Sequence, residues 1–312
     1  MIRFFLSFLG AIFSAITLGL FAAALVIGAV LWMYGRDLPN TDELAQYAPP
    51  TISRIYSGEG RLMDEFARER RLFAPSDEIP DLVKQAFISA EDKNFYNHKG
   101  YDPRGMISAA IEAARGGRLR GASTITQQVM KNFLLGGERS AERKIKEIIL
   151  ASRMEESLSK ERILELYLNE IFLGQNSFGV AAAAQTYFNK PLGELEVHEA
   201  AYLAVLPKAP SNYHPVRQRE RAVDRRNFVL REMFENGYID QTSYETARDM
   251  PLVTVQGGEI EGFRATMPDR DYFSDEIRRQ LSEQFGEEEF FGGGLAIRST
   301  MDPELQLEAA KA

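Results

Sequence analysis

The sequence predicts a mainly α-helical protein in which one transmembrane helix precedes the main domain and short β elements lie at both ends of that domain. Three observations support this fold class. Residues 4–35 form a run of 32 residues without a charge, whereas about 20 apolar residues suffice for a helix to span a bilayer. Apolar residues recur at helical spacing through most of residues 76–250. Short β-type runs occur before and after that region.

The uncharged run predicts a membrane anchor over residues 1–35. The apolar core of a secretory signal peptide is only about 7–15 residues long, and a buried core helix rarely reaches the length of this run. Arg3 and the amino terminus precede the run, while Arg36 after it is flanked by Asp37 and other acidic residues. This slight bias predicts a single-pass topology with the N-terminus inside, the rest of the chain outside the cytoplasm, and membrane lipid as a partner.

Composition limits the classes of function. The chain has 312 residues, of which 45% are hydrophobic and 26% are charged, and this balance is typical of a folded protein. Its net charge of −8 argues against general nucleic-acid binding, so any cationic patch must be local. The absence of cysteine excludes disulfides and thiolate metal sites.

Residues 36–75 are predicted to form a linker followed by a short β-hairpin. Residues 36–50 are polar and contain three prolines. The β-type runs at residues 52–56 and 62–66 flank Gly58-Glu59-Gly60, which favours a hairpin.

Residues 76–250 are predicted to form a domain built from a series of helices. After Pro80, apolar residues at helical spacing bring Glu91 and Asp92 to the carboxyl end of the first helix. Thr124, with Gln127 three residues later, fits the capping-box pattern, so a helix is predicted to begin there. Further helices are predicted at residues 106–114, from Ser140, from about Ser159 to Gly174, and at residues 181–187, 197–206 and 221–234.

The character of the sequence changes after about Pro251. Residues 252–255 and 295–300 look like strands, and the second run follows three consecutive glycines. Residues 251–312 are therefore predicted to open a further domain.

Glu91 is the first candidate for chemistry. Both the charge of Asp92 and the negative end of the helix dipole disfavour its ionisation, so a raised pKa is expected. A carboxyl group of that kind suits general-base or general-acid work near neutral pH. The alternative is that the acidic pair only caps a surface helix end.

Glu147 is the second candidate, in a region of positive charge. Arg143 and Lys144 lie four and three residues before it, so the three share one helix face. Between residues 115 and 146, eight Lys or Arg side chains oppose two glutamates, which gives a local charge of +6. Such a field suits a phosphate or pyrophosphate, and the alternative is a solvated face attracted to anionic lipid headgroups.

Residues 121–128 place small hydroxyl and amide side chains at a helix start. Capping explains Thr124, but it does not require Ser123, Thr126 and Gln128 as well, and sugars are natural partners for such a cluster. The three histidines lack zinc-ligand spacing, and His98 is expected to form a local hydrogen bond.

Five blocks in this order resemble the glycosyltransferase family 51 domain of class A penicillin-binding proteins. They are Glu91-Asp92-Lys93-Asn94-Phe95-Tyr96-Asn97-His98-Lys99-Gly100, Gly121-Ala122-Ser123-Thr124-Ile125-Thr126-Gln127-Gln128, Arg143-Lys144-Ile145-Lys146-Glu147, Ile163-Leu164-Glu165-Leu166-Tyr167-Leu168-Asn169-Glu170-Ile171-Phe172-Leu173-Gly174, and His198-Glu199-Ala200-Ala201-Tyr202-Leu203-Ala204 with Pro207, Pro210 and Pro215. The resemblance covers about residues 50–250, and residues 294–303 are similar to the linker that leads into the transpeptidase domain of these enzymes. Since that domain is missing here, we expect the chain to be part of a bifunctional enzyme and assign it no penicillin-sensitive activity.

The resemblance implies a lysozyme-like, mainly helical fold and polymerisation of lipid II into the glycan strands of peptidoglycan. By position, Glu91 matches the catalytic base, which takes the proton from the 4-hydroxyl of the acceptor N-acetylglucosamine. That oxygen then attacks the anomeric carbon of the donor N-acetylmuramic acid and expels undecaprenyl pyrophosphate with inversion. Positions near the leaving pyrophosphate are matched by Glu147, Lys131, Arg139, Arg143 and Lys144. Positions that contact sugar or phosphate, or that shape the site, are matched by Asp92, Ser123, Thr124, Gln127, Gln128 and Asn132.

The resemblance also bears on cofactors, partners and location. It leaves open a divalent cation, magnesium or manganese, beside the pyrophosphate. It implies lipid II and the growing glycan strand as substrates and leaves open other cell-wall synthesis proteins as partners. It places the anchor in the cytoplasmic (inner) membrane with the catalytic domain at the periplasmic face.

The distance between the carboxyl groups of the two glutamates is a test of the proposed chemistry. Inverting hydrolases hold their carboxyl groups roughly 6.5–9.5 Å apart to admit a water. A sugar acceptor is bulkier, so we predict a separation between Glu91 and Glu147 at or above that range. Two alternatives stay open: a lytic transglycosylase or muramidase, which needs no cationic patch because its substrate has no pyrophosphate, and a non-catalytic membrane-anchored scaffold that binds glycan.

Overall fold

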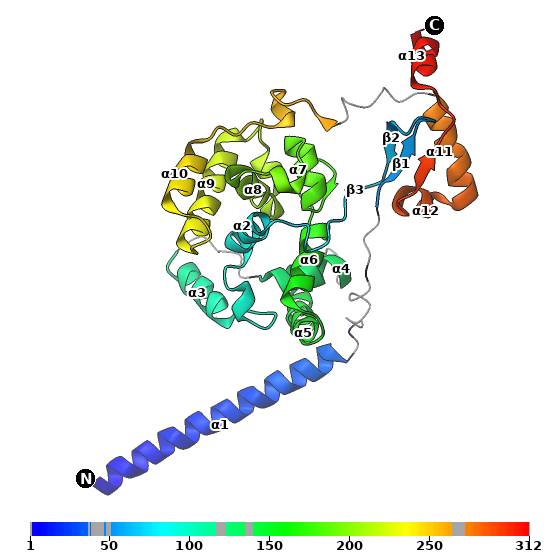
Figure 1. The fold of residues 1–312 in the computed structure, drawn as a ribbon. Helices are drawn as coiled ribbons and strands as arrows, with labels where there is room; N and C mark the ends of the chain where they lie inside the picture. Colours follow the sequence, from blue (N-terminus) through cyan, green and yellow to red (C-terminus); the bar gives the residue numbers. More distant parts are fainter. Residues whose placement is uncertain are drawn as a thin grey trace.

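A long N-terminal helix, a helical domain and a small β-containing lobe follow one another in space (Figure 1). The computed structural model describes residues 2–36, 38, 47, 51–116, 123–134, 140–263 and 272–311. Helix α1 extends away from the helical domain on one side, and the lobe that carries the C-terminal helix lies on the other side (Figure 1). The predicted fold class is confirmed, since the structure is mainly helical, with one long apolar helix before the domain and short strands at both of its ends.

Helix α1 (Ile2–Gly35) agrees with the predicted anchor in its extent. Its segment Gly10–Gly35 is long and apolar enough to cross a membrane, and its most apolar stretch is not buried against the rest of the described chain. The end of α1 meets α5, where the guanidinium of Arg153 donates a hydrogen bond of 2.7 Å to the carbonyl oxygen of Gly35. This bond satisfies one of the carbonyl groups that a helix leaves unpaired at its end.

The helical domain has a single hydrophobic core, to which most of its helices contribute. Phe87, Tyr167, Leu203 and Met233 come from four different helices and are all buried in this core. The helices are α2 (Asp81–Glu91), α3 (Pro103–Ala114), α4 (Ile125–Leu134), α5 (Ala141–Ser157), α6 (Lys160–Glu170), α7 (Val180–Phe188), α8 (Val197–Leu203), α9 (Arg219–Glu235) and α10 (Gln241–Asp249). Short 3-10 helices lie at Phe95–Asn97, Leu192–Glu194, Leu206–Lys208, Pro210–Tyr213 and Val255–Gly257.

Two of the predicted helix starts have serine caps. The hydroxyl of Ser140 accepts a hydrogen bond from the backbone N–H of Arg143, and that of Ser159 accepts one from Arg162. A side-chain cap of this type satisfies a backbone donor that has no partner within the helix, and its loss destabilises a protein by about 1 kcal/mol. Because α5 begins at a fixed residue, the positions of Arg143, Lys144 and Glu147 around the helix axis are also fixed.

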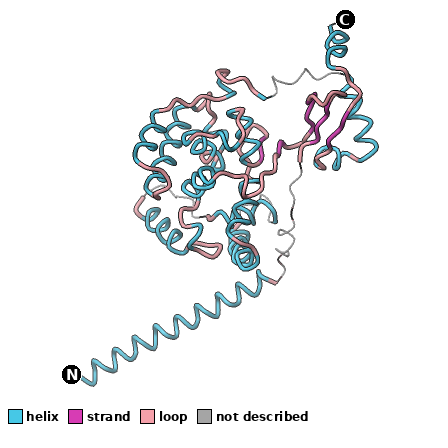
Figure 2. Tube along the Cα trace, viewed as in Figure 1, coloured by secondary structure: helices cyan, strands magenta, loops and turns pink. Residues whose placement is uncertain are grey.

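The β-containing lobe is assembled from two distant parts of the chain. Strands β1 (Ser53–Tyr56) and β2 (Leu62–Phe66) form the predicted antiparallel hairpin, and β5 (Ala296–Arg298) pairs with β1 in parallel, so the sheet order is β2-β1-β5. The strands gather at the edge of the otherwise helical structure (Figure 2). Helices α11 (Tyr272–Phe285) and α12 (Glu287–Gly292) cover this sheet, and α13 (Pro303–Lys311) follows it.

The tail therefore differs in part from the sequence-based prediction. Ile297 pairs with Ile55, and Phe290 and Met301 are buried with Phe66 in a second hydrophobic cluster. The tail thus completes the hairpin sheet. The strand predicted at residues 252–255 is wrong, because Leu252 is buried in the core of the helical domain and the chain then enters the 3-10 helix at residues 255–257.

A second, two-stranded sheet joins the lobe to the helical domain. Strand β3 (Arg70–Arg71) pairs in parallel with β4 (Ser177–Phe178). Arg71 also forms an ion pair with Glu170 at the end of α6. The connection between hairpin and helices is thus held by both backbone and side-chain contacts.

Candidate active site

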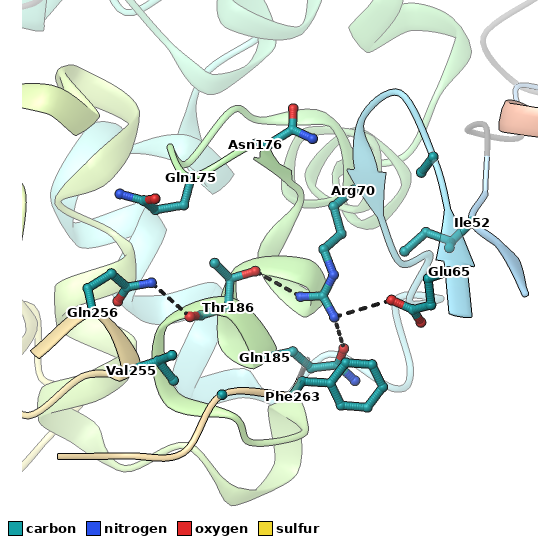
Figure 3. A pocket seen from close by; sticks show the side chains of 12 residues that line it. Ile52, Glu65, Arg70, Gln175, Asn176, Gln185, Thr186, Val255, Gln256 and Phe263 are labelled. Atoms are coloured by element: carbon teal, nitrogen blue, oxygen red, sulfur yellow. Dashed lines mark hydrogen bonds and ion pairs between the residues drawn. The ribbon is translucent and has the colours of Figure 1, made fainter. Parts of the chain in front are cut away.

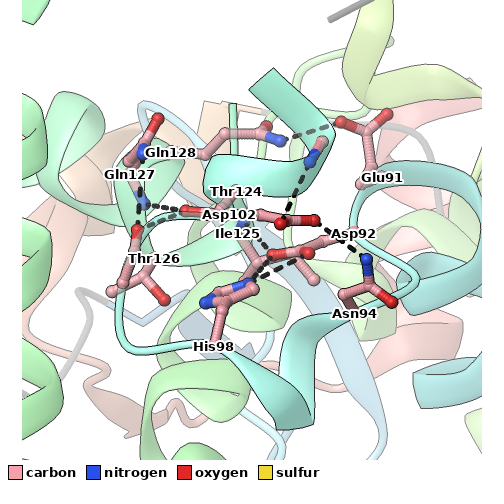
Figure 4. A network of polar contacts seen from close by, with 12 residues as sticks. Glu91, Asp92, Asn94, His98, Asp102, Thr124, Ile125, Thr126, Gln127 and Gln128 are labelled. Carbon is pink, nitrogen blue, oxygen red and sulfur yellow. Dashed lines mark hydrogen bonds and ion pairs between the residues drawn. The ribbon is translucent and has the colours of Figure 1, made fainter. Parts of the chain in front are cut away.

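Glu91 is the last residue of α2, and it lies half-buried beside α4. The apolar face of α2, including Val83 and Phe87, is fully buried, which fixes the helix against the core. The helix ends after Glu91 because Asp92 has a non-helical backbone. The side-chain amide of Gln128 on α4 donates a hydrogen bond of 2.8 Å to the Glu91 carboxylate (Figure 4).

The pKa of Glu91 is raised, as the sequence predicted, but for a different main reason. Burial raises the pKa of this carboxyl, and the charge of Asp92 adds only a smaller increase. The hydrogen bond from Gln128 and the positive charges of Arg225 and Lys208 lower the pKa. The sequence-based explanation named the Asp92 charge and the helix dipole, and it did not include burial, which is the main cause.

Asp92 contributes little to that shift because its carboxylate is turned toward other groups. His98 Nε2 lies 3.1 and 2.9 Å from its two oxygens, and the backbone N–H of Ile125 donates to Asp92 Oδ2 at 2.9 Å (Figure 4). The local hydrogen bond predicted for His98 is confirmed. Asp92 and His98 are both buried, so this pair joins the end of α2 to the start of α4. A direct contact between Asp92 and substrate stays a prediction.

Helix α4 is also joined to the loop that ends at Gly100. The hydroxyl of Thr124 donates to the carbonyl oxygen of Gly100 at 2.7 Å and accepts from the backbone N–H of Gln127 at 3.2 Å. Only the first half of the predicted capping box forms, because the Gln127 amide donates to Gly100 and accepts from Lys144 instead. Gly100 has a φ of 85°, and a Cβ there would lie 2.5 Å from the carbonyl oxygen of Ala151 on α5. This close packing brings α4 and α5 together.

Glu147 lies at the centre of a cationic cluster on α5. The carboxylate is only 3% exposed, and the Arg143 Nε and Lys144 Nζ atoms lie 3.0 and 2.9 Å from its two oxygens. The shared helix face predicted for these three residues is confirmed.

The Lys144 ammonium connects this cluster to α4. Besides Glu147, it donates to the hydroxyl of Ser123 at 2.8 Å and to the side-chain oxygen of Gln127 at 2.7 Å. Three oxygens from two segments of the chain thus surround one positive charge. Among the described residues, this arrangement joins the hydroxyl- and amide-rich segment to the basic segment.

The two glutamates are connected through neighbouring residues of α4. Gln128 contacts Glu91, while Gln127 contacts Lys144 and, through it, Glu147. Adjacent helical residues point about 100° apart, so the two carboxylates flank the same helix from different directions. The predicted separation between Glu91 and Glu147 stays a prediction.

The remaining predicted site residues lie farther along the chain. Lys131 and Asn132 are exposed in the last turns of α4. Arg139 lies outside the described residues. Their contacts to phosphate or sugar stay predictions.

Three residues near Glu91 were not identified from the sequence. Arg225 on α9 and Lys208 place positive charge near its carboxylate. Tyr167 on α6 is buried, and its hydroxyl has no hydrogen-bond partner among the described residues. Burial raises the pKa of Tyr167, and the charges of Glu91 and Asp92 raise it further. Tertiary packing brings these residues near Glu91, and no spacing pattern in the sequence predicts that they lie there.

The oxygens around Lys144 are potential ligands for a divalent cation only if they are not already engaged. Mg²⁺ and Mn²⁺ prefer oxygen ligands, and Ser123, Gln127 and Glu147 provide three. All three contact the Lys144 ammonium, and Arg143 is paired with the second oxygen of Glu147. Within the described residues there is no group of three or more His, Asp or Glu that could hold a metal ion. These residues therefore do not fit a metal held by the protein alone.

The chain is similar to known proteins over the residues that form this site. The family model described as Transglycosylase matches residues 59–234, which include Glu91, Glu147 and all of α4 and α5. The chain belongs to the transglycosylase family. The match begins in the hairpin and ends in α9, so it covers the helices that position both glutamates.

Relatives of this transglycosylase chain are longer proteins with the name penicillin-binding protein 1A. The one from Rickettsia felis is 45% identical over 299 residues, which cover 93% of this chain and 37% of the relative. The one from Aquifex aeolicus is 41% identical over 291 residues, which cover 92% of this chain and 39% of the relative. The chain thus spans less than two fifths of the length of these relatives.

A solved structure is also similar. The crystal structure of penicillin-binding protein 1A from Haemophilus influenzae matches 85% of this chain and 29% of its own, with 28% identity and a TM-score of 0.49.

Proposed function

We propose that this chain carries a peptidoglycan glycosyltransferase, which polymerises lipid II into glycan strands and releases undecaprenyl pyrophosphate with inversion. Membership of the transglycosylase family supports the reaction class. The observation that carries the proposal is the pair of glutamates that flank α4: Glu91 on α2 is held in a partly buried site by Gln128, and Glu147 on α5 is held among cations through Lys144.

Glu91 acts as the general base in this proposal. Because burial raises its pKa, its carboxylate binds a proton more strongly than an exposed glutamate does, and it is therefore the stronger base once ionised. It takes the proton from the 4-hydroxyl of the acceptor N-acetylglucosamine. The acceptor oxygen then forms a bond to the anomeric carbon of the donor N-acetylmuramic acid, and the bond from that carbon to the pyrophosphate oxygen breaks.

The cationic cluster stabilises the leaving pyrophosphate. Glu147 fixes Arg143 and Lys144 in place, so their positive charges need not reorganise as negative charge develops on the leaving group. Lys131 is exposed on the neighbouring helix and is proposed to contact the same group. Ser123, Thr124, Gln127, Gln128 and Asn132 are proposed to contact the sugars or phosphates or to shape their site.

A divalent cation, magnesium or manganese, is proposed to act only together with the substrate. Since the oxygens around Lys144 do not fit a metal held by the protein alone, the pyrophosphate would have to supply ligands.

Helix α1 is proposed to anchor the enzyme in the cytoplasmic membrane, with its N-terminus inside and the catalytic domain at the periplasmic face. The length of its apolar segment supports an anchor. The last residue of α1 contacts Arg153, which follows Glu147 by six residues on α5. A lipid-linked substrate and the site would then be held at the same membrane. Other cell-wall synthesis proteins are proposed as partners.

Labelled lipid II tests the proposal directly. The full chain in detergent is expected to form long polymer from it, whereas a lytic transglycosylase or muramidase would instead shorten purified glycan. Glu91→Gln is expected to abolish turnover while lipid II binding is retained, and a non-catalytic scaffold would show no turnover even before the substitution. Glu220→Gln, at an exposed position on α9, is the matched control and is expected to leave the rate unchanged. Polymerisation by Glu91→Gln at the unaltered rate would refute the proposal.

A further inference from the structure

A cavity apart from the candidate active site lies between the β-containing lobe and the helical domain. Its volume is about 350 Å³, which is at the lower end of the range of about 300–1,000 Å³ for small-molecule sites. Arg70 on the connecting strand β3 stands between Glu65 of the lobe and the side chains of Gln175 and Gln256 (Figure 3). None of these residues lies on α2, α4 or α5, which carry the candidate active site.

The charged side chains that line this cavity are already engaged with protein groups, and Glu65 also pairs with Arg54 at 3.0 Å. The Arg70 guanidinium donates to Thr186 and to the side-chain oxygen of Gln185, both at 2.9 Å, and lies 3.6 Å from a Glu65 oxygen. These are the only two charged residues that line it within the described part of the chain. The cavity therefore lacks an uncommitted cation for a carboxylate or phosphate, and a neutral ligand fits it better.

Side-chain amides remain available to such a ligand. Gln256 donates from its amide nitrogen to the Thr186 carbonyl, but its buried side-chain oxygen has no partner among the described residues. Gln185 uses its side-chain oxygen for Arg70. An unpaired buried polar atom is unfavourable by about 1–3 kcal/mol. Because this oxygen is closed off from solvent, a ligand pairs with it only if the Gln256 side chain turns toward the cavity.

Apolar side chains complete the lining. Ile52, Val255 and Phe263 border the same cavity as these amides. A mixture of amides, one aromatic ring and aliphatic groups suits an N-acetylated sugar, because its hydroxyls and amide form hydrogen bonds while its ring C–H groups and acetyl methyl need an apolar surface. A peptide with free carboxylates would lack a charged partner here.

We propose that this cavity is a second saccharide site, which binds an N-acetylhexosamine unit of the glycan strand at a distance from the reacting groups. The strand as the source of the sugar rests on the proposed function. The site itself rests on the cavity, the hydrogen-bonded Arg70 and the unpaired side-chain oxygen of Gln256.

The experiment uses the full chain in detergent and tetra-N-acetylchitotetraose, a probe without peptide or phosphate, with binding measured by calorimetry. Saturable binding is expected, and Gln256→Leu is expected to weaken it about 3- to 10-fold, which corresponds to the loss of one or two hydrogen bonds to a neutral ligand. Gln175→Gly is a second variant, since Gln175 has a φ of 50°, which glycine adopts readily. It removes an amide from the lining without backbone strain and is also expected to weaken binding.

Gln241→Leu is the matched control, because Gln241 is exposed at the start of α10, and it is expected to bind the probe like the unaltered chain. The inference is overturned if the probe does not bind, if Gln256→Leu and Gln241→Leu bind it equally, or if only Gln128→Leu weakens binding. It is also overturned if a stem peptide without sugar binds in preference to the probe. Binding that depends on Gln256 in a chain that fails to polymerise lipid II would refute the proposed function and leave this site supported.

Discussion

Replacing Lys144 by methionine should show how much the cationic cluster contributes to stability and to activity. Lys144 Nζ donates to Ser123, Gln127 and Glu147 at 2.7–2.9 Å, and Glu147 is 3% exposed. Removing the ammonium leaves a buried carboxylate whose remaining ion partner among the described contacts is Arg143. Removing one partner of a buried pair is unfavourable by about 3–5 kcal/mol. Because Arg143 stays, we expect a loss of about 2–4 kcal/mol in the free energy of unfolding.

The activity of Lys144→Met should fall by more than the loss of folded protein explains. Removing one positioned group that stabilises developing negative charge lowers kcat by about 10²–10³-fold. The assay is lipid II polymerisation at a temperature where the variant is folded, together with chemical unfolding to measure stability. Lys146→Met is the matched control, since Lys146 lies two residues away and pairs with the exposed Glu142. Its stability should change by no more than about 0.5 kcal/mol.

A double substitution checks the origin of the effect. Lys144→Met combined with Glu147→Leu removes both charges, and replacing both partners by apolar groups can be nearly neutral. The double variant should therefore recover part of the stability that Lys144→Met loses, without recovering activity. Equal rates and equal stabilities for Lys144→Met and Lys146→Met would refute the reasoning.

The same region gives four further predictions. Gln128→Leu removes a hydrogen bond that lowers the pKa of Glu91, so the acidic limb of the kcat/KM profile should move to higher pH, and an unmoved limb would exclude Glu91 as the base. Because the pKa of Glu91 is raised on folding, the stability that its protonated form contributes is present at low pH and is lost as the pH rises through the folded pKa. Glutamine resembles the protonated form at every pH. Glu91→Gln should therefore stabilise the protein more at pH 8 than at pH 4, as measured by thermal unfolding. Gly100→Ala combines a φ of 85° with a Cβ 2.5 Å from Ala151, so it should destabilise the fold by about 2–5 kcal/mol in chemical unfolding. Mg²⁺ should leave the Tm of the substrate-free chain unchanged, because Lys144 already contacts the oxygens of Glu147 and its neighbours; a rise in Tm that disappears in Glu147→Gln would contradict this.

The sequence by itself determined the features that depend on local geometry. The helix starts at Ser140 and Ser159 follow from capping residues, and the contacts of Glu147 with Arg143 and Lys144 follow from spacings of four and three residues. Within a helix such neighbours meet whatever the rest of the protein does. For the same reason α2 was placed correctly, with Glu91 at its end.

Only the tertiary structure decided which groups meet across helices and strands. It turned Asp92 toward His98 and Ile125, made burial the main cause of the raised pKa of Glu91, and brought Ser123 and Gln127 to Lys144. It also paired β5 with β1, although about 240 residues separate Ile297 from Ile55. These contacts join residues far apart in the chain, and they form because apolar faces pack together, which residue spacing alone does not encode.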